Sequence, residues 1–138
     1  MDDATLTKTI CAALGRIPGW IWDENAEYPP DRIGVYYGAI PDKPDRAVGV
    51  RMYSIPVDDE NTERIRRVQA RIRGSRHDRA DADRLATITR AVLVAMLPPA
   101  GISEILFYST GDLGSDNNQR EQRTENFTVS LDNQESAS

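Results

Sequence analysis

Few side chains in this chain of 138 residues could take part in catalysis. His77 is the only histidine and Cys11 the only cysteine. Hydrolysis and group transfer need a nucleophile with a base in reach, or paired carboxylates in a cleft. His77 lies in a hydrophilic turn before a helical pattern, and Cys11 lies among apolar residues at helical spacing, as a packed, inert thiol does. We therefore predict that the protein has no catalytic residues and is not an enzyme.

Binding motifs for metals and cofactors give no better candidate. The sequence has no phosphate-binding loop of the P-loop type, no Rossmann glycine fingerprint and no zinc-protease motif. The stretch 112–121 is rich in Gly, Asp and Asn, as calcium loops are, but Gly114 and Arg123 stand where an EF-hand places oxygen ligands. A single cysteine excludes an intrachain disulfide and a Cys-based zinc site. We predict no metal and no cofactor.

The segment 64–79 is the most unusual part of the sequence, with seven arginines and one acidic residue. Within it, 65–74 has the period of two that is typical of a strand with one apolar and one cationic face: Val68, Ala70 and Ile72 alternate with Gln69, Arg71 and Arg73. These arginines could contact carboxylates of a neighbouring subunit, form a solvated surface, or bind the phosphates of a nucleic acid. The whole chain is acidic and the segment has no aromatic residue for base stacking, which weighs against nucleic acid.

Charge is segregated along the chain. The formal net charge of −5 combines −6 over residues 23–63, +6 over 64–79 and −5 over 104–138. Such segregation can steer subunits onto one another, and it can equally belong to a solvated surface.

The periodicities predict two helices, 4–15 and 78–97, and strands at 33–40, 47–55, 65–74, 102–109 and 126–131. Asp78 is the expected N-cap of the second helix, with Asp81 three residues on. Its expected apolar stripe comprises Leu85, Ile88, Val92 and Met96, with Thr89 and Leu93 beside them. The resulting α-β-β-β-α-β-β order predicts an α+β domain in which two helices accompany a mainly antiparallel sheet of about five strands.

The remaining segments are expected to be irregular. Residues 18–30 contain Trp20 and Trp22, which could cover the core or protrude as an interface anchor. Residues 56–63 are expected to form a connection rich in Asp and Glu, and residues 111–125 a polar segment. We expect Val57–Glu63 and Asp112–Arg123 to be mobile in the monomer and ordered in an assembly. We predict one domain over 1–132 and a flexible tail over 133–138. The start has no features of a secretory signal and no apolar run is long enough for a membrane span.

With these elements in this order, the chain resembles the tail terminator proteins of long-tailed bacteriophages, also described as minor capsid or head–tail joining proteins. The resemblance spans about residues 33–132. It is carried by strand 68–74, the acid-capped helix 78–97, the polar turn 111–116 followed by Arg120 and Arg123, and strand 126–131.

The resemblance implies a structural protein of the virion tail that assembles in the host cytoplasm. Its expected partners are further copies of itself in a hexameric ring, the tail tube protein, and a head–tail connector or head completion protein, with genomic DNA passing through the ring and no membrane involved. Another head–tail connector component, or a nucleic-acid-binding module built on segment 64–79, is the alternative. The candidate interface residues are charged: Arg64, Arg66, Arg71, Arg73, Asp58, Asp59, Glu60, Asp112, Asp116, Arg120 and Arg123.

Overall fold

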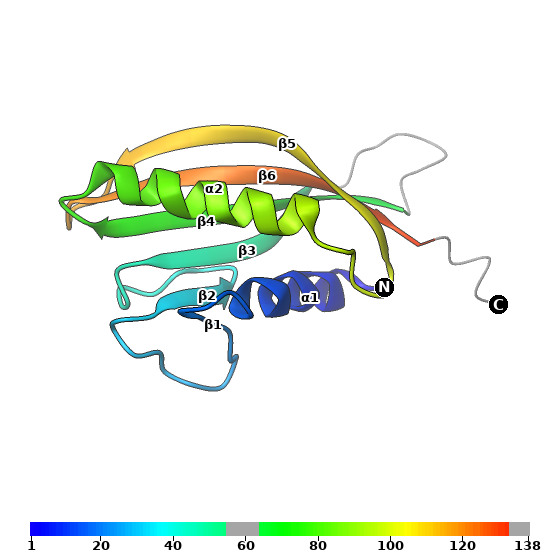
Figure 1. Cartoon of the computed structure of the whole chain (residues 1–138), viewed down its shortest axis with the longest axis horizontal. Helices are drawn as coiled ribbons and strands as arrows, with labels where there is room; N and C mark the ends of the chain where they lie inside the picture. Colours follow the sequence, from blue (N-terminus) through cyan, green and yellow to red (C-terminus); the bar gives the residue numbers. More distant parts are fainter. Residues whose placement is uncertain (55–63, 133–138) are drawn as a thin grey trace.

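The computed structural model describes residues 1–54 and 64–132. The connection expected over 56–63 and the tail 133–138 therefore lie outside the described residues. The described chain forms one six-stranded sheet in the order β1-β2-β3-β4-β6-β5, with two helices on one of its faces (Figure 1). The elements are α1 Asp3–Gly15, β1 Trp20–Ile21, β2 Ile33–Tyr37, β3 Ala47–Ser54, β4 Ile65–Arg76, α2 Arg79–Ala95, β5 Ile102–Ser115 and β6 Arg120–Leu131. The predicted α+β class is confirmed, and so is the predicted element order apart from the additional short strand β1.

The two helices cover different halves of the sheet. α1 packs on β1, β2 and β3, whereas α2 packs on β4, β6 and β5. The apolar residues that meet between helices and sheet include Leu6, Ile10 and Leu14 of α1 and Leu85 and Leu93 of α2, all at most 2% exposed. Because both helices lie on one face, the opposite face of the sheet carries no helix from residues 1–54 and 64–132, and we call it the helix-free face.

Strand β4 lies at the centre of the sheet and pairs antiparallel with β3 on one side and β6 on the other. Val68, Ala70 and Ile72 are buried towards the helices, as the alternation predicted. The outer pairs β1–β2 and β2–β3 are parallel. The sheet is therefore antiparallel over its longest strands, with a short parallel part beside α1.

The parallel pair β2–β3 requires the connection 38–46 to return along the sheet. Gly38 begins this connection with φ +83, a left-handed conformation that favours glycine. A side-chain carbon on Gly49 of β3 would lie 2.3 Å from the carbonyl oxygen of Gly38. The missing side chain at Gly49 thus lets the connection pass closely over the helix-free face.

Two segments predicted as irregular contain strands. Trp20 and Ile21 form β1, and Trp20 is 3% exposed in the core, while Trp22 is half-buried against it. The prediction of a polar loop over Asp112–Arg123 is wrong. Asp112 pairs with Arg123, and Ser115 pairs with Glu121, within the β5–β6 hairpin. Backbone hydrogen bonds between paired strands need no apolar side chains, so a polar sequence does not exclude a hairpin.

The apolar stripe of α2 also differs from the prediction. Ile88 is 39% exposed, whereas Ala82 and Ala86, which the prediction left out, are buried together with the expected Thr89. The helix therefore turns small side chains towards β4 and β6, which lets its backbone approach the sheet, and Ile88 falls outside the buried stripe. Cys11 is fully buried as expected, and burial raises the pKa of its thiol to about 12.

Candidate assembly surface

Arg73 is buried, and the prediction that it lies on an exposed strand face is wrong. Its side chain is on the helix-free face, but the connection 38–46 covers it and leaves the residue 5% exposed. Its guanidinium donates to the carbonyl oxygens of Asp45 at 2.8 Å, Pro41 at 2.8 Å and Pro44 at 2.7 Å. Burial lowers the pKa of Arg73, and the neighbouring cation Arg120 lowers it further. Arg73 thus holds the connection on the sheet.

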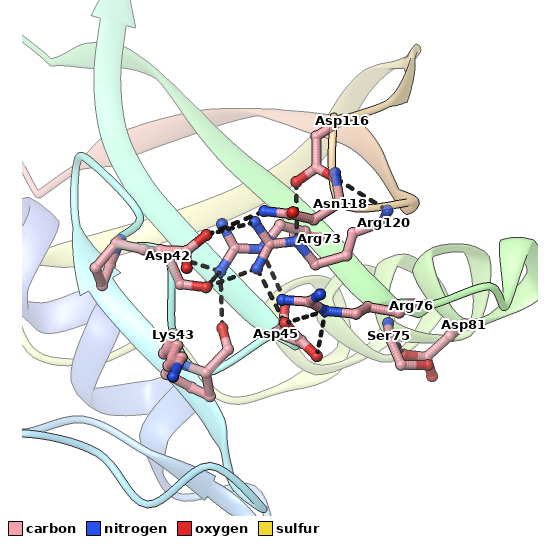
Figure 2. Close-up of polar contacts among 12 residues, drawn as sticks. Asp42, Lys43, Asp45, Arg73, Ser75, Arg76, Asp81, Asp116, Asn118 and Arg120 are labelled. Carbon is pink, nitrogen blue, oxygen red and sulfur yellow. Dashed lines mark hydrogen bonds and ion pairs between the residues drawn. The ribbon is translucent and has the colours of Figure 1, made fainter.

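Arg120 holds the tip of the β5–β6 hairpin to the same connection (Figure 2). Its guanidinium is 2.9 Å from Asp116, 3.0 Å from Asp45 and 3.1 Å from Asp42. Burial would lower the pKa of Arg120, but these carboxylates raise it above its usual value. We call the five residues Asp42, Asp45, Arg73, Asp116 and Arg120 the Arg73–Arg120 cluster. The cluster joins three parts of the chain that are far apart in sequence, so its charges serve the fold.

Asp81 extends this network to the start of α2 rather than capping the helix. Its carboxylate accepts from the Ser75 N–H at 2.8 Å and from Arg46 at 2.9 Å. Burial would raise the pKa of Asp81, but these hydrogen bonds outweigh it and lower the pKa below its usual value. Asp78 is the N-cap residue as predicted, yet its side chain makes no cap hydrogen bond and instead accepts from Arg84 at 2.7 Å.

Other predicted interface residues also have partners within the chain. Arg66 is 3.1 Å from Asp3 of α1, and the Arg64 side chain donates to the Leu131 carbonyl at 3.4 Å. Arg123 contacts Asp83 of α2 on the helix-covered side, and the exposed Asp112 accepts from the Gly114 N–H at 2.9 Å. The structure therefore distributes segment 64–79 over several surfaces rather than forming one. Asp58, Asp59 and Glu60 lie outside the described residues.

One group of arginines does share a surface. It is formed on the helix-free face by residues that alternate with the buried ones of β3 and β4, and register places Arg51 opposite Gln69. We call it the cationic sheet face: Arg51 and Tyr53 of β3, Arg67, Gln69 and Arg71 of β4, and Tyr108 of β5. Arg71 was predicted from the sequence, whereas Arg51 and the two tyrosines were not.

The polar partners on this face are mostly neutral. Arg71 donates to the Gln122 side chain at 3.0 Å, and the Arg67 guanidinium lies 4.2 Å from the centre of the Tyr108 ring. The Arg67 Nε atom is buried with no hydrogen-bond acceptor among the described residues. Burial raises the pKa of Tyr53, and the positive charge of Arg67 opposes that shift. Within residues 1–54 and 64–132, the side chain of Arg51 has no hydrogen bond or ion pair.

The cationic sheet face borders a groove beside the connection 38–46. Ile40 from the connection and Leu113 from β5 line it together with Arg51, Gln69 and Arg71. Leu113 is 51% exposed, and Leu106 and Tyr108, farther along the same edge strand, are 48% and 51% exposed. A surface that combines exposed apolar side chains with arginines is typical of protein interfaces.

No group of three or more His, Cys, Asp and Glu residues that could hold a metal ion occurs in 1–54 and 64–132. His77 occupies the exposed turn between β4 and α2, with φ 58. Over the same part of the chain, no helix is long and apolar enough to cross a bilayer.

The alternation in β3 is the signal that could have identified the missed residues. In the stretch 47–54, Val48, Val50 and Met52 alternate with Gly49, Arg51 and Tyr53, which predicts Arg51 and Tyr53 on the polar face. Tyr108 had no such signal, because register shifts in β5 between Phe107 and Ser109 break its alternation. The position of Tyr108 against Arg67 depends on strand order, which local sequence does not specify.

Comparison with known families identifies the class of protein to which these features belong. A model of the bacteriophage tail terminator protein family matches residues 23–133. The match covers most of the chain, including every strand of the sheet after β1 and the whole of α2. The chain is therefore a member of the bacteriophage tail terminator family, a class of structural tail components of the virion. A search of curated proteins found no match.

Proposed function

We propose that the protein caps the phage tail tube as a hexameric ring, ends tube polymerisation and forms the surface on which the head connector or head completion protein docks. Membership of the tail terminator family carries this proposal. The role is recognition without catalysis: one side of the ring matches the last ring of the tube, and the other side offers no further site for tube subunits. Genomic DNA passes through the ring, and assembly takes place in the host cytoplasm.

The organisation of the domain supports this role. A ring subunit has to present at least two different surfaces to its neighbours, because identical chains joined around a rotation axis meet through unlike patches. The Arg73–Arg120 cluster fixes the β2–β3 connection and the β5–β6 tip together, which provides a rigid end. The cationic sheet face is separate from it and has few charged partners within the described chain.

Tube assembly in vitro tests the proposal. Purified tail tube protein is polymerised with increasing amounts of this protein, and tube length and tube ends are measured by negative-stain electron microscopy. We expect shorter tubes, a ring at one end only, and a stable complex with the mass of six chains in light scattering. Tubes of unchanged length without end rings would contradict the function. Addition of a tail protein from the same phage that is unrelated to this family serves as a control for nonspecific shortening.

The nucleic-acid alternative makes a different prediction. If segment 64–79 were a binding module, the protein should bind duplex DNA with an affinity that falls steeply with salt. The burial of Arg73 and the pairing of Arg66 with Asp3 leave fewer arginines of this segment available for phosphates than the sequence suggests. Filter binding of duplex DNA over a range of salt concentrations separates this alternative from the capping function.

A further inference from the structure

Within residues 1–54 and 64–132, the arginines of the cationic sheet face have no carboxylate partner, whereas many other arginines of the chain do. Arg46, Arg76, Arg84, Arg90, Arg120 and Arg123 each lie within ion-pair distance of an Asp or Glu. For Arg51, Arg67 and Arg71, the described residues supply no such carboxylate. Because the chain has a net charge of −5, three arginines gathered on one face favour an anionic surface as partner.

An exposed acidic surface of this kind exists elsewhere on the same chain. The loop between β1 and β2 carries four exposed carboxylates within nine residues, and Figure 1 shows it projecting beyond β1: Asp23, Glu24, Glu27 and Asp31. We call residues 23–31 the acidic loop. Its one ion pair with the described residues joins Glu24 to Lys8 at 3.2 Å, with both side chains about half exposed. Exposed pairs of this type stabilise little, so the loop presents nearly all of its negative charge to solvent.

The acidic loop is held in place by Tyr28. The Tyr28 hydroxyl accepts from the Asp23 N–H at 2.8 Å and donates to the Val35 carbonyl at 2.9 Å, and its ring lies 4.9 Å from that of Tyr36. Pro29 and Pro30 restrict the backbone beyond it. A loop whose conformation is fixed before binding loses less entropy when it docks. The acidic loop is therefore suited to act as a preformed contact.

We propose that the acidic loop of one copy docks on the cationic sheet face of the next copy in the ring. The proposal rests on the ring function above and names the surfaces through which neighbouring subunits meet. The loop lies beyond β1 at one edge of the sheet, whereas Arg51 and Arg71 lie on the central strands β3 and β4. Contact between two different patches of identical chains is heterologous and closes into a ring when the rotation fits.

The groove beside the connection 38–46 gives this contact a place to form. Arg51 and Arg71 line it and offer planar guanidinium groups that suit carboxylates. Ile40 and Leu113 add apolar surface that the neighbouring loop would cover. Partial exclusion of water at such a contact strengthens the attraction between the opposite charges.

The test uses charge reversal on each side of the contact in the full-length chain. The face variant carries Arg51→Glu and Arg71→Glu, and the loop variant carries Asp23→Lys, Glu24→Lys and Asp31→Lys. Mass is measured by light scattering for the protein alone and with tail tube protein. We expect each variant to lose ring assembly, with association weakened roughly a hundredfold or more because like charges face each other. Circular dichroism and thermal melting check that both variants fold.

A mixture of the two variants gives the decisive result. The glutamates of one variant then face the lysines of the other, and the unchanged arginines face unchanged carboxylates, so alternating rings with an even number of subunits can close. We expect rings in the equimolar mixture and in a single chain that carries all five changes. The control variant Arg16→Glu, Arg79→Glu has the same charge change as the face variant at exposed sites outside the contact, and it should assemble as the wild type does.

Three outcomes would overturn the proposal. Normal ring assembly by the face variant would show that the cationic sheet face is not the subunit contact. Absence of rings in the mixture and in the five-change chain, with all variants folded, would show that the loop is not its partner. Loss of duplex DNA binding by the face variant, with ring assembly retained, would identify nucleic acid as the occupant. A wild type that forms no ring, alone or with tube protein, would instead contradict the capping function itself.

Discussion

Arg71 and Arg73 are two residues apart on the same face of β4, yet their side chains have different environments and different partners. Arg73 is 5% exposed and donates to backbone carbonyls of the connection 38–46, whereas Arg71 is exposed beside a groove and bonds to the neutral side chain of Gln122. The difference arises from where the connection crosses the sheet, not from the residue type. A cation covered by the chain's own backbone stabilises the fold, while a cation left beside that backbone remains available to a partner.

Replacing Arg73 by Met gives the largest expected effect on stability. The substitution leaves several carbonyl oxygens of the connection 38–46 without their donor, and the free energy of unfolding should fall by about 3 kcal/mol or more. Urea unfolding followed by circular dichroism measures the change. Arg71→Met is the matched control and should change stability by less than about 0.5 kcal/mol. Equal losses for the two variants would remove the distinction between the two arginines. A combined charge reversal at both positions would therefore test folding rather than assembly.

Asp81→Asn should give the next largest effect, and the effect should depend on pH. The pKa of Asp81 in the folded chain is lowered, so its ionised form stabilises the fold above the unfolded-state pKa. This stabilisation is lost as the pH falls through the folded-state pKa. We expect Asp81→Asn to cost about 1–3 kcal/mol at pH 7 and to unfold almost as the wild type does in strong acid.

Stability curves over pH for the wild type, Asp81→Asn and Asp31→Asn measure this difference. Asp31 is exposed and has no hydrogen bond or ion pair to the described residues, so its variant should follow the wild type throughout. A difference between wild type and Asp81→Asn that stays constant from neutral to acid pH would mean that the ionised carboxylate is not the source of the effect.

The contrast between Arg71 and Arg73 also shows what could be predicted from the sequence. Alternation in 65–74 correctly predicts which residues face the helices, because burial of Val68, Ala70 and Ile72 is a local consequence of the period of two. It cannot tell Arg71 from Arg73, since covering Arg73 depends on a connection about 30 residues earlier in the chain. The family resemblance, the order of the main elements and two residues of the cationic sheet face, Gln69 and Arg71, could thus be predicted, but the arrangement of that face could not.

Glu125 is a second position where local pattern was insufficient. It lies on the helix-covered side of β6, where alternation with Phe127 and Val129 favours an apolar residue, yet it is fully buried and ion-paired with Arg90 of α2. The Arg90 guanidinium also lies 4.1 Å from the centre of the Phe107 ring. A buried ionised acid needs a cation beside it, and here α2 supplies Arg90. The polar sequence of 111–125 therefore indicated a loop, because local sequence does not show that a cation from α2 pairs with the buried Glu125 of the hairpin.

Tyr108→Leu, on the cationic sheet face, should lower stability by much less than Arg73→Met does. The substitution removes the aromatic ring that faces Arg67 but keeps an apolar side chain at the sheet edge. Because an exposed cation–π contact contributes about 0.5–1 kcal/mol, the free energy of unfolding should fall by no more than that amount. Thermal melting measures the change, and Leu106→Ala, on the same strand without the cation, provides a comparison. A loss as large as that of Arg73→Met would show that the cationic sheet face also maintains the fold.

Salt should affect the buried Arg73 and the exposed cationic sheet face differently, and for Arg73 the expected change in stability is the smallest of this series. At about 1 M salt the Debye length falls to about 3 Å, so attraction between exposed charges is screened, whereas buried hydrogen-bonded groups are screened much less. The stability difference between wild type and Arg73→Met should therefore be nearly the same at low and high salt, because the Arg73 guanidinium lies under the connection 38–46. Ring assembly should weaken over the same range, because its proposed contact joins exposed charges. Urea unfolding and light scattering on the same samples measure both quantities. A stability difference that disappears at high salt would show that water and ions reach Arg73, and the two regions would then differ only in their partners.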